Sequence, residues 1–179
     1  MMQAEQSGAT VAYNWIHDVP KYGIRMDGPF GGTNSGRNAS VHHNVLWNAN
    51  GAIVAKGDYH NVSNNTVLLG YEGDRNHIIV LYDSTGGNEN STIMSNAADT
   101  ISGHRTNSNE SNPIPVNNTT IGNNWNGYDS QNTNQTVFGM LVSPENYDFR
   151  PVIGSATTGK LRNRRRCASR LPSDEESKP

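Results

Sequence analysis

The sequence predicts an all-β fold, a solenoid of short parallel strands wound into a β-helix of about five coils. Two observations carry this prediction: a repeated pattern V-x-x-N-x-[I/V], and a composition rich in asparagine but poor in apolar residues. The 179 residues include 25 asparagines and 18 glycines, whereas only 33% are hydrophobic and 17% are charged. A solenoid suits such a chain, because each of its repeats buries only a thin slice of apolar surface.

The repeat occurs five times along the chain and defines the coils in order. The first three copies are complete, whereas Ala98 and Asn126 replace the final aliphatic residue of the fourth and fifth. The intervals between successive repeat asparagines are 30, 21, 31 and 28 residues, which indicates a basic coil with loop insertions. The copies are Val11–Ile16, Val41–Leu46, Val62–Val67, Ile93–Ala98 and Ile121–Asn126.

The spacing within the repeat predicts a bend in the backbone. The two aliphatic positions are five residues apart, and an odd separation in a continuous strand places side chains on opposite faces. Both can point inward only if the chain turns a corner between them. Asparagine readily takes the left-handed conformation that a corner needs, so we expect it there. Stacked coils would align the five amides as a hydrogen-bonded ladder. The ladder residues are Asn14, Asn44, Asn65, Asn96 and Asn124.

A second apolar segment follows most copies of the repeat, so each coil is expected to hold two or three short strands. These segments are Gly23–Met26, Ala52–Ala55, His77–Leu81 and Gly139–Val142. Aligning the first three on Ile24, Ile53 and Ile79 gives an inward stack of Met26, Ala55 and Leu81. The same alignment gives outward stacks of Arg25, Val54 and Val80, then of Asp27, Lys56 and Tyr82.

Together, the repeats and the Gly-Ile-x-[Met/Val] segments resemble the right-handed β-helix repeats of the pectate-lyase-like superfamily. The resemblance covers roughly residues 9 to 145, and Tyr147–Ser155 resembles the D-[FY]-R-x-x-x-G-S element that often closes such domains. It implies a right-handed, single-stranded parallel β-helix in a secreted polysaccharide lyase or glycoside hydrolase. The superfamily also includes inactive repeat proteins. The alternative is therefore a non-catalytic domain that binds glycan or protein, or acts as a structural spacer.

These patterns divide the chain into two segments. Residues 1–159 are expected to hold the coils and the closing segment, whereas residues 160–179 mix basic and acidic side chains without a strand pattern and are expected to be a disordered tail. Enzymes of the pectate-lyase-like superfamily usually have more than five coils. The sequence therefore resembles a C-terminal fragment of a longer helix.

The outward stack after the second apolar segment groups side chains capable of catalysis. In a lyase, Arg25 or Lys56 would neutralise a uronate carboxylate, and Lys56 or Tyr82 would remove the neighbouring proton. In a hydrolase, Asp27 and Asp58 would serve as the acid and as the base or nucleophile. The alternative for the same residues is a solvated ladder of ion pairs, which adds little stability.

Histidines form a second candidate group. Asp18 could orient the imidazole of His17 as a general base, and Lys21, in the same loop, is a candidate for substrate binding. Adjacent His42 and His43 are expected to point to different sides and not to share a metal ion. No spacing in the chain matches a zinc motif.

Charge and hydropathy limit the partners. The net charge of −2 and a basic run confined to the tail argue against a nucleic-acid binder. No apolar stretch reaches membrane-spanning length. The expected partner is a polysaccharide or another glycan, and the expected state is a monomer.

No cofactor is required by the sequence, although oxygen ligands from four acidic residues could form a calcium site. These residues are Asp58, Glu72, Asp74 and Asp83. No signal peptide is visible, but the fold and several Asn-x-Ser/Thr sequons are typical of an extracellular protein. The sequons begin at Asn38, Asn61, Asn64, Asn90, Asn109, Asn117, Asn118 and Asn134.

Overall fold

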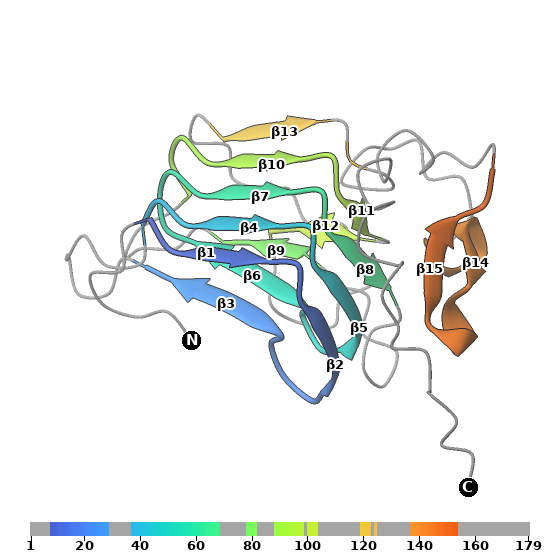
Figure 1. Cartoon of the computed structure of the whole chain (residues 1–179). Coiled ribbons are helices and arrows are strands. Elements are labelled where there is room, and N and C mark those ends of the chain that lie inside the picture. Colours follow the sequence, from blue (N-terminus) through green and yellow to red (C-terminus); the bar gives the residue numbers. More distant parts are fainter. Residues whose placement is uncertain are drawn as a thin grey trace, which may run out of the picture.

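A computed structural model describes residues 8–28, 37–68, 78–81, 88–98, 100–103, 119–122, 124 and 137–153. Its strands form three parallel sheets and one antiparallel hairpin (Figure 1). In chain order the elements are β1 (Thr10–Ala12), β2 (Trp15–Val19), β3 (Ile24–Asp27), β4 (Ser40–His42), β5 (Val45–Ala49), β6 (Ile53–Lys56), β7 (Asn61–Ser63), β8 (Thr66–Leu68), β9 (Ile78–Val80), β10 (Thr92–Met94), β11 (Ala97–Ala98), β12 (Ile101–Ser102), β13 (Thr120–Gly122), the 3-10 helix η2 (Val137–Met140), β14 (Leu141–Ser143), the 3-10 helix η3 (Pro144–Asn146) and β15 (Asp148–Pro151).

Each of the first four coils contributes one strand to each of three sheets, and among the described residues the fifth contributes β13 to the first sheet. The first sheet has the order β1-β4-β7-β10-β13, the second β2-β5-β8-β11 and the third β3-β6-β9-β12. All of these pairings are parallel, and every third strand of the chain stacks on its equivalent in the next coil. The arrangement is that of a parallel β-helix, as the repeat predicted.

The repeat aliphatics lie in register and fill the space between the sheets. Val41, Val62 and Ile93 are fully buried in one stack of the first sheet. Leu46, Val67 and Ala98 form the corresponding stack of the second sheet. Because both sets belong to one core cluster, the predicted bend between them is confirmed.

The asparagine ladder is also confirmed. The backbone N–H and the side-chain amide of Asn44 both donate to Oδ1 of Asn65, at 3.1 and 3.0 Å. Asn65 makes the same pair of bonds to Asn96, and Asn96 makes them to Asn124. Asn14 begins the series by donating to Asn44. Each rung therefore satisfies buried polar groups at a corner where the strand ladder is interrupted.

The left-handed residue at the corner is not the ladder asparagine, which corrects the sequence prediction. The positive φ falls one residue earlier, at Tyr13, His43, Asn64 and Ser95, with values of 56 to 60°. That preceding residue turns the chain from the first sheet toward the second. The amide of the asparagine that follows then points along the stack, toward the asparagine of the next coil.

Two assignments of the second apolar segment were wrong. The register pairs Ile53 with Ile78 rather than with Ile79, so the third coil is shifted by one position. In addition, Gly139–Val142 does not form a coil strand. Its residues belong to η2 and to β14, which pairs antiparallel with β15. The fourth coil instead supplies β12 to the third sheet.

The C-terminal hairpin covers the outer face of the second sheet. Figure 1 shows β14 and β15 (orange) beyond β5 and β8. Apolar residues of both parts form one buried cluster between them. Its members are Val45, Leu68, Ala97, Val137, Met140, Leu141 and Phe149. Within the part of the chain described here, no helix is long and apolar enough to cross a membrane.

Candidate functional site

The ionic residues predicted on the third sheet lie side by side, and two of them are largely buried. Asp27 of β3 pairs in register with Lys56 of β6, and Arg25 donates to the Asp27 carboxylate. Asp27 and Lys56 are only 8% and 6% exposed, respectively. The Arg25 guanidinium lies 5.2 Å from the centre of the Tyr22 ring. These side chains are on the predicted face, but Asp27 and Lys56 present only a small part of their surface to solvent.

Tyr82 lies outside the described residues, but the register of the residues before it is described. The backbone N–H of Leu81 donates to the carbonyl of Ala55, which continues the β6–β9 pairing by one residue. Leu81 therefore stands beside Lys56. The predicted stack of Asp27, Lys56 and Tyr82 includes a residue outside the described ranges, and it stays a prediction for Tyr82.

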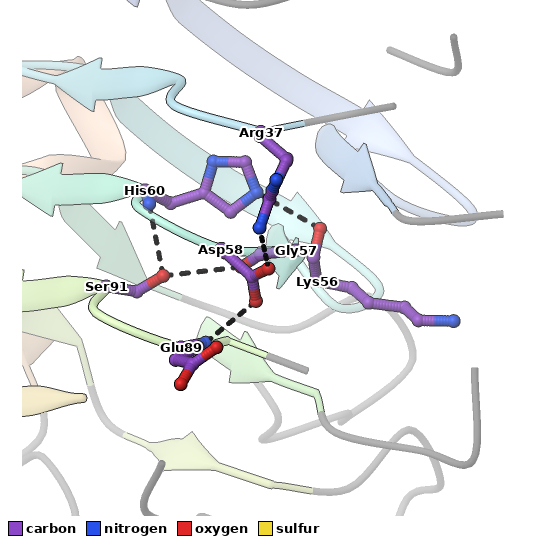
Figure 2. Close-up of polar contacts among 7 residues, drawn as sticks. All are labelled: Arg37, Lys56, Gly57, Asp58, His60, Glu89 and Ser91. Atoms are coloured by element: carbon purple, nitrogen blue, oxygen red, sulfur yellow. Dashed lines mark hydrogen bonds and ion pairs between the residues drawn. The ribbon is translucent and has the colours of Figure 1, made fainter. Parts of the chain in front are cut away.

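Asp58 joins three successive turns between coils (Figure 2). Its carboxylate pairs with Arg37 at 2.8 Å and accepts a bond from the backbone N–H of Glu89 at 3.0 Å. Arg37 precedes the second coil, Asp58 precedes the third, and Glu89 precedes the fourth. The carboxylate therefore ties together the positions where neighbouring coils begin.

His60 reinforces the same turns from inside. Its Nδ1 accepts from the backbone N–H of Ala39 at 3.1 Å, and its Nε2 lies 3.1 Å from the carbonyl of Lys56. The backbone N–H of His60 donates to Ser91 Oγ at 3.0 Å. In Figure 2 the Lys56 side chain extends away from this group, while its carbonyl faces His60. His60 is only 1% exposed, so these hydrogen bonds are buried and stabilise the turns between coils.

Of the four acidic residues predicted to form a calcium site, the structure describes only Asp58. Glu72, Asp74 and Asp83 lie outside the described residues, and Asp58 is bound to Arg37. Among the residues described, no three His, Cys, Asp or Glu side chains are grouped so that they could hold a metal ion.

An aromatic cluster, which we call the aromatic face, lies where the hairpin meets the second sheet. It consists of Trp15 on β2, Trp47 on β5, Phe149 on β15 and Tyr147, which precedes β15. The ring centres of Trp15 and Phe149 are 5.3 Å apart, and those of Trp47 and Tyr147 are 5.7 Å apart. Phe149 is buried and anchors the cluster, whereas Trp15 and Tyr147 remain 61% and 58% exposed. Such an exposed aromatic patch is typical of a binding surface.

Polar groups border the aromatic face. The His17 ring stacks on Trp47 with centres 4.5 Å apart, and its Nδ1 lies 2.6 Å from the Asp18 carboxylate. The side-chain amide of Asn48, in the next coil, donates to the other oxygen of Asp18. The predicted His17–Asp18 contact is thus present, and both side chains are exposed. Lys21 is exposed in the loop after β2, and no interaction links it to the pair.

The Asp18 carboxyl provides a test of this geometry. Two hydrogen bonds lower the pKa of Asp18 below its ordinary value of 3.8. The one from the Asn48 side chain has the larger effect, and the one from His17 comes second. We expect Asn48→Gly to raise that pKa toward 3.8, because the principal donor is lost. Glycine is chosen because Asn48 has a φ of 50°. A carboxyl-carbon NMR titration measures the change, and an unaltered titration would show that Asn48 does not bind Asp18 in solution.

The hydrogen bonds to Asp18 also make the stability of the fold depend on pH. Because the pKa of Asp18 is lowered in the folded state, the contact stabilises the fold above pH 3.8 and is lost as the pH falls through the lowered pKa.

Sequence reasoning found His17 and Asp18 but missed the aromatic face. A signal was present, because Trp15 and Trp47 occupy the first and third positions after the corner asparagine of successive repeats. Both positions point outward, as the inward position between them holds Ile16 or Leu46. The contribution of Tyr147 and Phe149 could not be found in this way, because nothing in the repeat indicates where the closing segment docks.

Comparisons with models of known protein families, with curated proteins and with solved structures found no match to this chain.

Proposed function

We propose that the chain is a β-helix domain that binds carbohydrate on the aromatic face, with the right-handed coil of the pectate-lyase-like superfamily. Right-handed winding is favoured because parallel strands joined by a crossover almost always connect in that hand. The observation that supports binding is the exposed pair Trp15 and Tyr147, held in place by Trp47 and Phe149 beneath them.

The chemistry of the aromatic face suits a sugar. One side of a pyranose ring presents C–H groups that pack on an indole or a phenol ring, while its hydroxyls need hydrogen-bond partners. Asp18, Asn48 and His17 offer acceptors and donors at the border of the aromatic rings. Binding sites for small molecules commonly combine apolar contact area with a few polar groups in this way.

The test is binding of the full chain to cellulose, xylan, polygalacturonate and alginate by affinity gel electrophoresis and pull-down. We expect the wild type to bind at least one of these polymers. Trp15→Ala should weaken that binding about tenfold or more, because it removes the most exposed ring of the face.

A matched pair of variants controls for non-specific loss. Tyr147 and Tyr59 are both exposed tyrosines with φ of 60°, and asparagine tolerates that backbone. Tyr147→Asn should weaken binding, whereas Tyr59→Asn, in the turn before β7, should not. Equal loss in both variants, or retention of full affinity by Trp15→Ala, would contradict the proposal.

Catalysis at the same face is the second candidate function, as a polysaccharide lyase or glycoside hydrolase. The observation favouring it is the 2.6 Å contact between His17 and Asp18, which would orient the imidazole as a general base. Elimination produces new reducing ends and the absorbance of an unsaturated uronate, whereas hydrolysis produces reducing ends alone. Activity that disappears in His17→Ala would support this candidate over binding alone.

An extracellular location is part of the proposal, since extracellular glycans would be the ligands. The sequon asparagines Asn38, Asn61 and Asn90 are exposed and could accept glycans in a secretory compartment.

A further inference from the structure

The corner between β4 and β5 holds two histidines whose ring nitrogens meet. The Nδ1 atoms of His42 and His43 lie 2.9 Å apart, and their rings are nearly perpendicular, at 89°. This arrangement differs from the sequence expectation that the two side chains point to different sides. The difference arises because His43 has a φ of 56°, which turns its side chain back toward His42.

Tyr13, from the corner of the preceding coil, fixes both rings. Its phenol stacks on His43 with ring centres 5.1 Å apart and meets His42 edge-on at 5.6 Å. The backbone bonds from Tyr13 to His42 and from His43 to Ser63 hold the corner within the stack. The imidazoles are therefore positioned before any ligand binds.

We propose that His42 and His43 form a chelating site for a divalent transition-metal ion, with Cu²⁺ the most strongly bound. Two nitrogens that bind one ion at about 2.0 Å each lie about 2.8–3.3 Å apart, for bond angles between square-planar and tetrahedral. The observed 2.9 Å separation falls in this range. Imidazole nitrogen suits copper, nickel and zinc, and copper stands highest in the affinity order.

Binding requires a change of tautomer and a rotation of the two rings, because hydrogen-bonded nitrogens face each other rather than a common ion. In the neutral pair, one Nδ1 carries the proton that the other accepts. When the donor ring moves its proton to Nε2, both Nδ1 atoms carry a lone pair, and rotation of the rings turns these lone pairs toward a shared ion. Water supplies the remaining ligands, so this is a two-residue site. The inference is independent of glycan binding, because neither histidine belongs to the aromatic face.

The experiment uses the full, tag-free chain with Cys167→Ser, since the only thiol would otherwise compete for copper. At half an equivalent of Cu²⁺, electron paramagnetic resonance should show coupling to two imidazole nitrogens. Calorimetry should show that His43→Asn weakens the affinity for the first equivalent of Cu²⁺ on the order of 10²-fold, as expected when a chelate loses one of its two ligands. Asparagine is used because it tolerates the positive φ.

His42→Ala serves as the second variant, and circular dichroism confirms that each variant is folded. His17→Asn is the control, because the Nδ1 of His17 is bound to Asp18 and His17 lies on β2 of the second sheet, away from the corner after β4. Unchanged first-equivalent affinity in folded His43→Asn or His42→Ala would overturn the proposal. Coupling to a single nitrogen in the starting protein, or loss of the site in His17→Asn, would also overturn it.

Discussion

Asn65→Leu should destabilise the fold by about 3 kcal/mol or more, a large part of the stability of an ordinary domain. Asn65 is fully buried and accepts two bonds from Asn44. Its amide donates to the carbonyl of Val41 and to Asn96. Leucine is similar in size but forms none of these bonds, so buried donors and acceptors in three coils would lose their partners.

Urea titration followed by circular dichroism measures the loss, and Asn61→Leu is the matched control. Asn61 belongs to the same coil, but its side chain is exposed on β7. Its replacement should change the free energy of unfolding by no more than about 0.5 kcal/mol. Similar losses in both variants would show that the ladder does not contribute more than an exposed asparagine.

Asp58→Ala should destabilise the fold by about 2–3 kcal/mol, the second largest effect expected. The substitution removes the acceptor for the backbone N–H of Glu89 and leaves the Arg37 guanidinium without its carboxylate. The Asp58 side chain is 12% exposed, so water replaces these contacts only in part. The turns before the second, third and fourth coils would lose their common link.

Asp148→Ala is the control for this variant, because Asp148 also pairs with an arginine. That partner, Arg150, is 71% exposed, and surface ion pairs contribute about 0–1 kcal/mol. Thermal unfolding of the two variants gives the comparison. If Asp58→Ala is as stable as Asp148→Ala, Asp58 does not brace the coils and becomes available for the catalytic role considered from the sequence.

The fold was predictable because its rule is local and repeats. A bend between Val41 and Leu46 is required for both to face one core, and this requirement recurs in each of the first four coils. The ladder follows from the same spacing. The left-handed position was less predictable, since residues as different as Tyr13 and Ser95 adopt it. Their conformation is imposed by the corner rather than by their own preference.

The candidate site was predictable only in part. His17 and Asp18 are neighbours in the sequence, so their contact is local. Arg25, Asp27 and Lys56 were placed on the correct face, but nothing in their spacing indicated how deeply they are buried. The third coil is shifted by one residue from the predicted alignment, which places Leu81 beside Lys56. Short apolar runs such as Ile78–Val80 leave the register open to such a shift.

The docking of the hairpin could not be deduced from the repeats. Leu141 and Phe149 pack on Val45 and Leu68 through contacts between segments far apart in the chain. That docking brings Tyr147 beside Trp47, and it is the step that creates the aromatic face.

The central claim, that the aromatic face binds carbohydrate, is tested most directly by NMR of the wild-type chain titrated with oligosaccharides of the polymer it retains. The account predicts that the indole N–H signals of Trp15 and Trp47 shift together with the ring signals of Tyr147, while those of Tyr59 do not. Saturable binding that leaves the Trp15 signal unmoved, or no binding to any of the polymers tested, would contradict the account.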